Sequence, residues 1–303
     1  MVRATEISPR PPIEANSLQL ELATGCPQGK RCKFCNLYTN GFKPASREQI
    51  MADIREVADL WFMRPRRVFL QSGDPFSVPH DLLVFTLEAI RDYLPEVESV
   101  GGFCRVATVK RTADEELADW ARLGVANLAI GAESGDDEAL AGANKQHTAA
   151  DIIEQCARLD AHGITYTLFY MPGLAGAGNG QRNALASAAV YSQTRPLYIN
   201  CITTTIGDDS EFGREVAAGA FTRASDRECV EEIRTFISKL TCPTTFDCMN
   251  ELNAVKFMVP LPLGRDSIVE QLDGALEPQH AAYLDSFNEQ RQRITSGYYP
   301  ERQ

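Results

Sequence analysis

Residues 18–35 read LQLELATGCPQGKRCKFC and place a strand pattern directly before three closely spaced cysteines. Apolar and polar residues alternate over residues 18–22, which predicts a strand. Cys26, Cys32 and Cys35 then follow within ten residues. Because the loops after the strands build the active site of an α/β barrel, a cysteine loop at this place predicts a metal site. Three thiolates can hold one iron–sulfur cluster and leave one iron open to chelate a bound substrate.

The residues around the three thiols leave more than one metal possible. Lys30, Arg31 and Lys33 bring positive charge, which lowers a cysteine pKa and favours the thiolate. A structural zinc site would need a fourth ligand, and the first histidine of the chain is His80. By spacing alone, an iron–sulfur cluster, a zinc knuckle and unligated cysteines are all open.

Strand and helix patterns alternate along most of the chain and predict an α/β fold. We predict strands at residues 18–22, 68–70, 100–108, 126–131, 165–170 and 198–203. Helices are predicted after Ser46 and at residues 81–93, 113–123, 149–162, 181–192 and 226–240. Six successive strand–helix units imply parallel strands with right-handed crossovers, as in a partial (β/α)6 TIM-type barrel or an open doubly wound sheet.

The partial barrel is the fold that we predict, with a short, mostly helical C-terminal extension. The expected organisation is an irregular lead-in at residues 1–16, the barrel at residues 17–241 and the extension at residues 242–303. Within the extension, residues 244–248 predict one strand, and residues 266–276 and 278–294 predict helices.

Composition restricts the compartment and the partners. The 303 residues carry a formal net charge of −11, which favours a small-molecule or peptide ligand over nucleic acid. No apolar run is long enough for a membrane span, and residues 1–16 lack the apolar core of a signal peptide. Nine cysteines without an export signal predict reduced thiols and a cytoplasmic protein.

The spacing Cys-x5-Cys-x2-Cys, with Phe34 between the last two cysteines, resembles the cysteine loop of the radical S-adenosylmethionine (SAM) superfamily. The commonest spacing in that superfamily is Cys-x3-Cys-x2-Cys, so this chain resembles an atypical member. Later segments are similar to the branch of the elongator-like, methylthiotransferase and coproporphyrinogen oxidase groups. These segments are Ser72-Gly-Asp-Pro75, Ile130-Gly-Ala-Glu-Ser-Gly135, Asn144-Lys-Gln-His-Thr148 and Met171-Pro-Gly-Leu-Ala-Gly176.

The resemblance implies a [4Fe–4S] cluster on Cys26, Cys32 and Cys35 and a SAM site along the ends of successive strands. The expected SAM-binding residues are Phe34, Tyr38, Ser72, Gly73, Asp74, Arg105, Glu133, Met171, Gly173 and Leu174. Residues 72–75 would receive the SAM amino group, Glu133 its ribose or amino group, and residues 171–176 its adenine.

Each of these segments also has an ordinary structural interpretation. Residues 72–75 could be a plain strand-to-helix turn, Glu133 a solvated loop acid and Thr148 a helix N-cap. Arg105 suits a carboxylate only if its strand points it into the barrel mouth. Asn200 is either a substrate contact or an orienting residue in a polar core.

The chemistry implied by the resemblance is reductive cleavage of SAM, followed by radical chemistry on a small-molecule substrate. A reductant such as flavodoxin or ferredoxin is the expected partner. Alternatives are 3-amino-3-carboxypropyl transfer from SAM, tRNA modification, and a zinc-stabilised binding protein without catalysis. The remaining C-terminal cysteines contain no CxxC pair, so we expect buried free thiols there rather than a second cluster.

Overall fold

The computed structural model describes residues 10–29, 31–35, 37–38, 41–60 and 64–298. Its main sheet has the strand order β1-β4-β5-β6-β7-β8-β9-β10. The strands are β1 (Leu18–Glu21), β4 (Arg67–Gln71), β5 (Ser99–Cys104), β6 (Leu128–Glu133), β7 (Tyr166–Tyr170), β8 (Tyr198–Cys201), β9 (Thr244–Asp247) and β10 (Met258–Leu261). A separate pair joins β2 (Ala23–Thr24) and β3 (Lys43–Pro44). Residues 1–9 of the predicted lead-in, and Lys30, lie outside the described residues.

The sheet is mostly parallel, which confirms the predicted α/β class. β1 pairs with β4, β4 with β5, β5 with β6 and β8 with β9 in parallel, and β10 runs antiparallel to its neighbour β9. Four of the five residues of β4 are buried, as expected for a parallel strand covered on both faces. The predicted strand at residues 244–248 is confirmed as β9.

Helices alternate with the strands as the apolar patterns predict. They are α1 (Arg47–Asp59), α2 (His80–Tyr93), α3 (Val106–Arg111), α4 (Asp114–Arg122), α5 (Asp137–Gly142), α6 (Ala149–Ala161), α7 (Gly180–Tyr191), α8 (Glu211–Ala217), α9 (Asp226–Lys239), α10 (Arg265–Ala275) and α11 (Ala281–Tyr298). The predicted capping box at Ser46 and Gln49 opens α1. Thr148 and Asp151 form a reciprocal pair at the start of α6, which confirms the N-cap interpretation of Thr148.

The predicted strand at residues 100–108 is wrong beyond Cys104, because residues 106–111 form α3. Arg105 is the N-cap of this helix, and Thr108 lies three residues further on. Both side chains bind one carboxylate oxygen of Asp74. Residues three apart share a face on a helix but lie on opposite faces of a strand, so this shared partner favours the helical turn.

Several short elements were not predicted, among them α5, α8 and β10. α5 and α8 are six and seven residues long, too short for a clear apolar repeat. β10 contains Pro260 and forms the end of the sheet order, where a missing backbone donor is tolerated.

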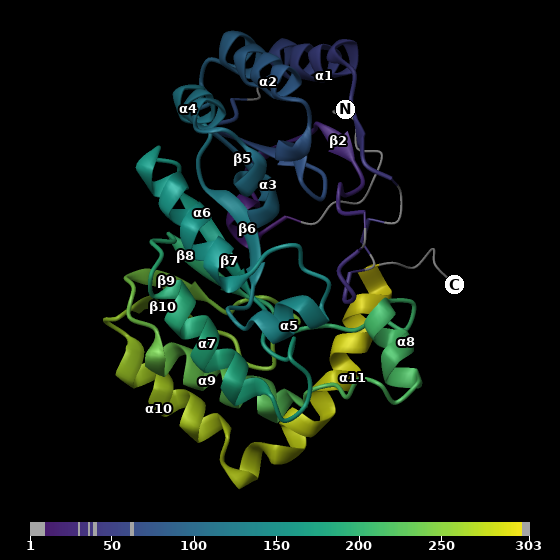
Figure 1. The fold of residues 1–303 in the computed structure, drawn as a ribbon, viewed down its shortest axis with the longest axis vertical. Helices are drawn as coiled ribbons and strands as arrows, with labels where there is room; N and C mark the ends of the chain where they lie inside the picture. The colour runs from purple at the N-terminus through teal and green to yellow at the C-terminus, as the bar shows by residue number, and fades with distance from the viewer. Residues whose placement is uncertain (1–9, 30, 36, 39–40, 61–63, 299–303) are drawn as a thin grey trace. The chain divides into compact units, whose positions relative to one another are not determined.

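The chain divides into two compact units, which interleave along the sequence. Unit 1 comprises residues 1–29, 37–131 and 155–167, and unit 2 comprises residues 30–36, 132–154 and 168–303. In unit 1, α1 packs on α2, and α2 contacts α4 (Figure 1). In unit 2, α7 and α10 both pack on α9 (Figure 1). A stack of Tyr170 on Phe236, with ring centroids 4.2 Å apart, lies in the core of unit 2.

The cysteine loop is shared between the units, with Cys26 in unit 1 and both Cys32 and Cys35 in unit 2. The predicted boundary between residues 241 and 242 stays a prediction. None of the helices within the described ranges is both long enough and apolar enough to cross a membrane.

Candidate functional site

In unit 1 the first cysteine is packed against the turn that ends β4. The backbone N–H of Gly73 donates to the carbonyl of Gly25 at 2.9 Å. A Cβ added to Gly73 would stand 2.7 Å from the Cβ of Cys26 and 3.0 Å from the ring of Tyr38. Such distances are too short for any side chain, so this close approach requires glycine. The structure thus brings together three of the predicted residues, Cys26, Tyr38 and Gly73.

Asp74 follows this turn and is fully buried. Its Oδ2 accepts from Arg105 Nε at 2.8 Å, from Ser77 Oγ at 2.9 Å and from Thr108 Oγ1. Its Oδ1 is buried without a hydrogen-bond partner among the described residues. Asp74 and Arg105, both predicted to bind SAM, therefore bind each other through Oδ2, and Oδ1 of Asp74 has no hydrogen-bond partner among the described residues.

In unit 2 the second half of the cysteine loop is a tight turn held from two sides. Cys35 N–H donates to the Cys32 carbonyl at 3.0 Å, and Lys33 N–H donates to the Ala143 carbonyl at 3.0 Å. Lys33 Nζ also forms an ion pair with Glu215 of α8 at 2.6 Å. The short helix α8 therefore helps to fix the backbone between the two cysteines.

Glu133, at the end of β6, is an ion-pair partner rather than a solvated loop acid. Its Oε1 lies 3.1 Å from Lys145 Nζ, and only 11% and 6% of the two side chains are exposed. Lys145 Nζ in turn lies 5.9 Å from the centre of the Phe34 ring. Glu133 has a φ of +66°, an uncommon conformation for a residue other than glycine. The structure thus joins the Glu133 segment, the Asn144–Thr148 motif and the cysteine loop.

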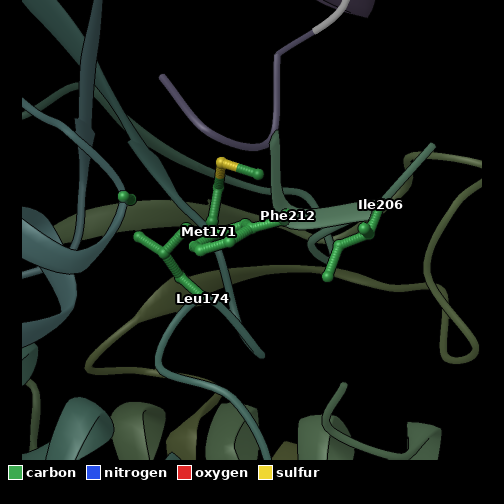
Figure 2. Packing of buried hydrophobic residues seen from close by; sticks show 5 residues of the cluster. Met171, Leu174, Ile206 and Phe212 are labelled. Atoms are coloured by element: carbon green, nitrogen blue, oxygen red, sulfur yellow. The ribbon is translucent and has the colours of Figure 1, made fainter. Parts of the chain in front are cut away.

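The turn after β7 is packed in an apolar cluster of unit 2. Met171 and Leu174 belong to this cluster together with Phe212 and Ile206, and Phe34 packs against it. Figure 2 shows the side chains of Met171, Leu174 and Phe212 close together. Leu174 is almost fully buried, whereas Met171 keeps 9% of its surface exposed.

Gly173, in the same turn, is held by a buried acid on α9 that the sequence did not single out. The backbone N–H of Gly173, which has a φ of +82°, donates to Glu232 Oε2 at 2.9 Å. Glu232 also accepts from Tyr170 Oη and Asn183 Nδ2. Burial raises the pKa of Glu232 from 4.5 to about 7, although these three hydrogen bonds oppose the rise. The sequence contains a signal for this buried acid, because Glu232 is a charged residue on the apolar helix face formed by Cys229, Ile233 and Phe236.

Asn200, the tentative substrate residue, is buried on β8 and pairs in register with Asp247 of β9. Whether Asn200 contacts a substrate or orients a polar core stays a prediction, because either role would place it in a buried polar position.

The nine cysteines fall into two groups, and none of them forms a disulfide. Cys26, Cys32 and Cys35 are partly exposed, whereas the other six are buried. Burial raises the pKa of five of these buried thiols: Cys104, Cys156, Cys201, Cys229 and Cys242. No group of three or more His, Cys, Asp or Glu residues suited to a metal ion is present in the part of the chain that the structure describes.

The sequence profile of the radical SAM superfamily matches residues 20–186, more than half of the chain. The chain belongs to the radical SAM superfamily. This radical SAM chain is accordingly an enzyme, and the cofactors of its family are a [4Fe–4S] cluster and SAM. The predictions of family, enzyme class and cofactors are thereby confirmed. No curated protein is similar enough in sequence to match the chain.

Three of the solved structures that share the fold illustrate the likeness. The radical SAM methyltransferase TsrM from Kitasatospora setae, with cobalamin and a [4Fe–4S] cluster bound, has a TM-score of 0.55 at 13% identity and covers 67% of this chain and 37% of its own. Coproporphyrinogen III oxidase (HemN) from Escherichia coli has a TM-score of 0.56 at 13% identity, covering 73% and 51%. Archaeal Elp3 from Methanocaldococcus infernus has a TM-score of 0.50 at 15% identity, covering 76% and 59%.

Identities this low show the fold alone, which is the partial barrel type that the sequence predicts. The radical SAM chain described here spans between 37% and 59% of the length of these three structures.

Proposed function

We propose that Cys26, Cys32 and Cys35 ligate the [4Fe–4S] cluster and that the enzyme uses it to cleave SAM reductively and to start radical chemistry on a small-molecule substrate. The observation that carries this proposal is the division of the cysteines. The only partly exposed thiols among the nine are the three in the loop, and this loop lies inside the segment matched by the family profile. Three thiols fit a cluster that keeps one iron open for SAM.

Held by Cys26, Cys32 and Cys35, the reduced cluster would supply the electron for reductive cleavage of the 5′ carbon–sulfur bond of SAM, which would start the radical chemistry. The chain's own contribution is to bind and orient SAM and to exclude water. Gly73 would let Cys26 lie close to the β4 turn, and the ion pair of Lys33 with Glu215 would fix the backbone between Cys32 and Cys35.

The SAM contacts are proposed from the geometry within each unit. Asp74 Oδ1 is a buried acceptor without a partner in the described residues, which suits the SAM ammonium, and Arg105 would position Asp74 through Oδ2. In unit 2, Lys145 holds one oxygen of Glu133, and the carboxylate would accept hydrogen bonds from the ribose or the amino group. Phe34 and Met171 would offer apolar contact to the adenine.

The remaining parts of the proposal rest on the sequence. The net charge of −11 supports a small molecule over tRNA as the substrate. A flavodoxin or ferredoxin would supply the electron, and the cytoplasm would be the compartment. The functional body would be residues 17–241, with residues 242–303 as an extension.

Product analysis tests this function. The protein is reconstituted anaerobically with iron and sulfide, reduced with dithionite and incubated with SAM. The proposal predicts 5′-deoxyadenosine and methionine as products. Methylthioadenosine would instead support 3-amino-3-carboxypropyl transfer, and a colourless protein that holds zinc and leaves SAM intact would contradict enzymatic cleavage altogether.

A further inference from the structure

Unit 2 contains a small cavity next to the Gly173 turn that no predicted site residue other than Gly173 lines. Its wall is formed by the turn after β7, the segment after β8, the segment before α9, α9 itself and α11. The lining residues are Gly173, Thr204, Thr205, Ile206, Arg223, Ala224, Cys229 and Arg291. The cavity has a volume of about 20 Å³ and is partly open. That volume holds one or two oxygen-sized atoms, so it suits an end group of a ligand and not a whole molecule.

Two of the residues that line the cavity each carry a buried polar atom that has no hydrogen-bond partner among the described residues. These atoms are Thr204 Oγ1 and Arg223 Nε. Because a buried polar group without a partner is destabilising, two such residues in the lining of one small cavity point to a polar ligand. The guanidinium N–H is a charged donor and the hydroxyl can donate as well, so the ligand group must be an acceptor.

The charge of the wall is opposite to that of the chain. The net charge of the whole sequence is −11, yet the cavity is lined by two arginines and by no aspartate or glutamate. Arg291 is buried and forms an ion pair with Asp226, so its charge is largely balanced. Arg223 is only loosely balanced, since its Nη2 lies 3.5 Å from Asp208 Oδ1 and the Asp208 side chain is 99% exposed.

Cys229 adds no negative charge to this wall. Burial, followed by the nearby Glu232 and Asp226 carboxylates, raises the pKa of the Cys229 thiol well above its usual value, so the thiol stays neutral. Its Sγ would lie 3.0 Å from a Cβ placed on Gly173, which shows how closely the turn approaches α9 here.

We infer that this cavity binds a carboxylate group of the enzyme's small-molecule substrate, with Arg223 Nε and Thr204 Oγ1 as its donors. A planar carboxylate offers two oxygens, which matches both the volume and the two donors, whereas a phosphate is tetrahedral and larger. Thr204 N–H donates to the Pro172 carbonyl at 2.9 Å, so the segment that carries one proposed donor is hydrogen-bonded to the turn at residues 171–176, which is proposed to lie along the adenine. The identity of the bound molecule as the substrate rests on the proposed function, but the carboxylate site itself does not.

Binding of acetate, measured without any turnover, tests the inference. The thermal midpoint of the protein as purified is followed against acetate concentration, with potassium chloride replacing acetate to hold the ionic strength constant. The native chain should show a saturable rise. In Arg223→Gln the half-saturating acetate concentration should increase at least tenfold, because a charge-assisted hydrogen bond is lost. Thr204→Val, which keeps the side-chain shape, should increase it several-fold.

Arg234→Gln is the matched control, because it removes one positive charge from unit 2 on α9 without lining the cavity. It should leave the acetate response unchanged. If Arg223→Gln failed to fold, Thr204→Val would decide the matter alone.

The inference would be overturned by an acetate response that is absent, that is equal in Arg223→Gln and the native chain, or that is weaker than the response to inorganic phosphate. It would also be overturned if saturating SAM abolished the acetate response of the reconstituted enzyme, since the cavity would then belong to SAM. None of these outcomes depends on SAM cleavage, so the carboxylate site and the proposed function can fail separately.

Discussion

Glu232 should make the stability of this protein depend on pH, and replacing it with glutamine should remove that dependence. The pKa of Glu232 is about 7 in the folded chain against an ordinary value of 4.5. Between these two values the unfolded chain has released the proton while the folded chain still holds it. The contribution of Glu232 to stability is therefore fully present below pH 4.5 and is lost as the pH rises through about 7. The full difference corresponds to about 3 kcal/mol of unfolding free energy.

The groups around Glu232 do not obscure this effect. Burial raises the pKa values of Tyr170, Cys201 and Cys229 well above neutrality, so these groups stay uncharged. The pKa of Glu228 shifts in the opposite direction. Burial would raise this pKa, but hydrogen bonds from Ser225 and Gly178 leave it below its ordinary value. Glu228 is therefore ionised between pH 5 and pH 8, and Glu228→Gln serves as a control on the same helix.

Urea unfolding of the native chain, Glu232→Gln and Glu228→Gln at pH 5 and pH 8 provides the measurement. From pH 5 to pH 8 the unfolding free energy of Glu232→Gln should improve relative to the native chain by between about 2 and 3 kcal/mol. Glu228→Gln should follow the native chain. An equal difference between Glu232→Gln and the native chain at both pH values would refute the assignment of a proton to the buried acid.

Further substitutions test the two halves of the proposed site. Gly73→Ala should lower the unfolding free energy by about 1–3 kcal/mol, because its Cβ would overpack against Cys26, and it should lower the iron bound after reconstitution. Gly274→Ala, which has open space around it, should do neither, and equal iron contents in the two variants would contradict the close approach of Gly73 to Cys26. Asp74→Asn should lower the unfolding free energy by about 3–5 kcal/mol in urea, since Arg105 loses a buried charged partner, and an unchanged midpoint would speak against that pairing. Lys145→Met should raise the SAM concentration needed for half-maximal cleavage and leave the iron content unchanged, whereas Lys239→Met, which changes an exposed lysine, should alter neither quantity. A loss of iron in Lys145→Met would instead mean that Lys145 supports the binding of the cluster.

Much of the fold follows from local patterns in the sequence. The strand at residues 18–22, the capping box at Ser46 and the apolar repeat of residues 149–162 each have short-range causes, and each is found in the structure within a few residues. The family could be predicted for a similar reason, because the cysteine loop and each of the glycine turns is a short continuous stretch of sequence.

The departures come from contacts between residues distant in the sequence. The three β-branched residues Val106, Thr108 and Val109 suit a strand, but Asp74 binds Arg105 and Thr108 together and the helical turn prevails. Similarly, Glu232 stands 59 positions after Gly173, and only the fold shows that it accepts the hydrogen bond of that turn. The sequence therefore predicts which residues belong to the candidate site, but the hydrogen-bond and ion-pair partners of these residues are seen only in the structure.

The central claim is that three of the nine cysteines hold the cluster, and iron content with electron paramagnetic resonance tests it most directly. Cys26→Ala, Cys32→Ala and Cys35→Ala are reconstituted anaerobically and reduced beside Cys156→Ala, which removes a buried thiol. The account predicts about four irons and a reduced [4Fe–4S] signal for Cys156→Ala and the native chain, and loss of both in each loop variant. A loop variant that kept its iron and still yielded 5′-deoxyadenosine from SAM would contradict it.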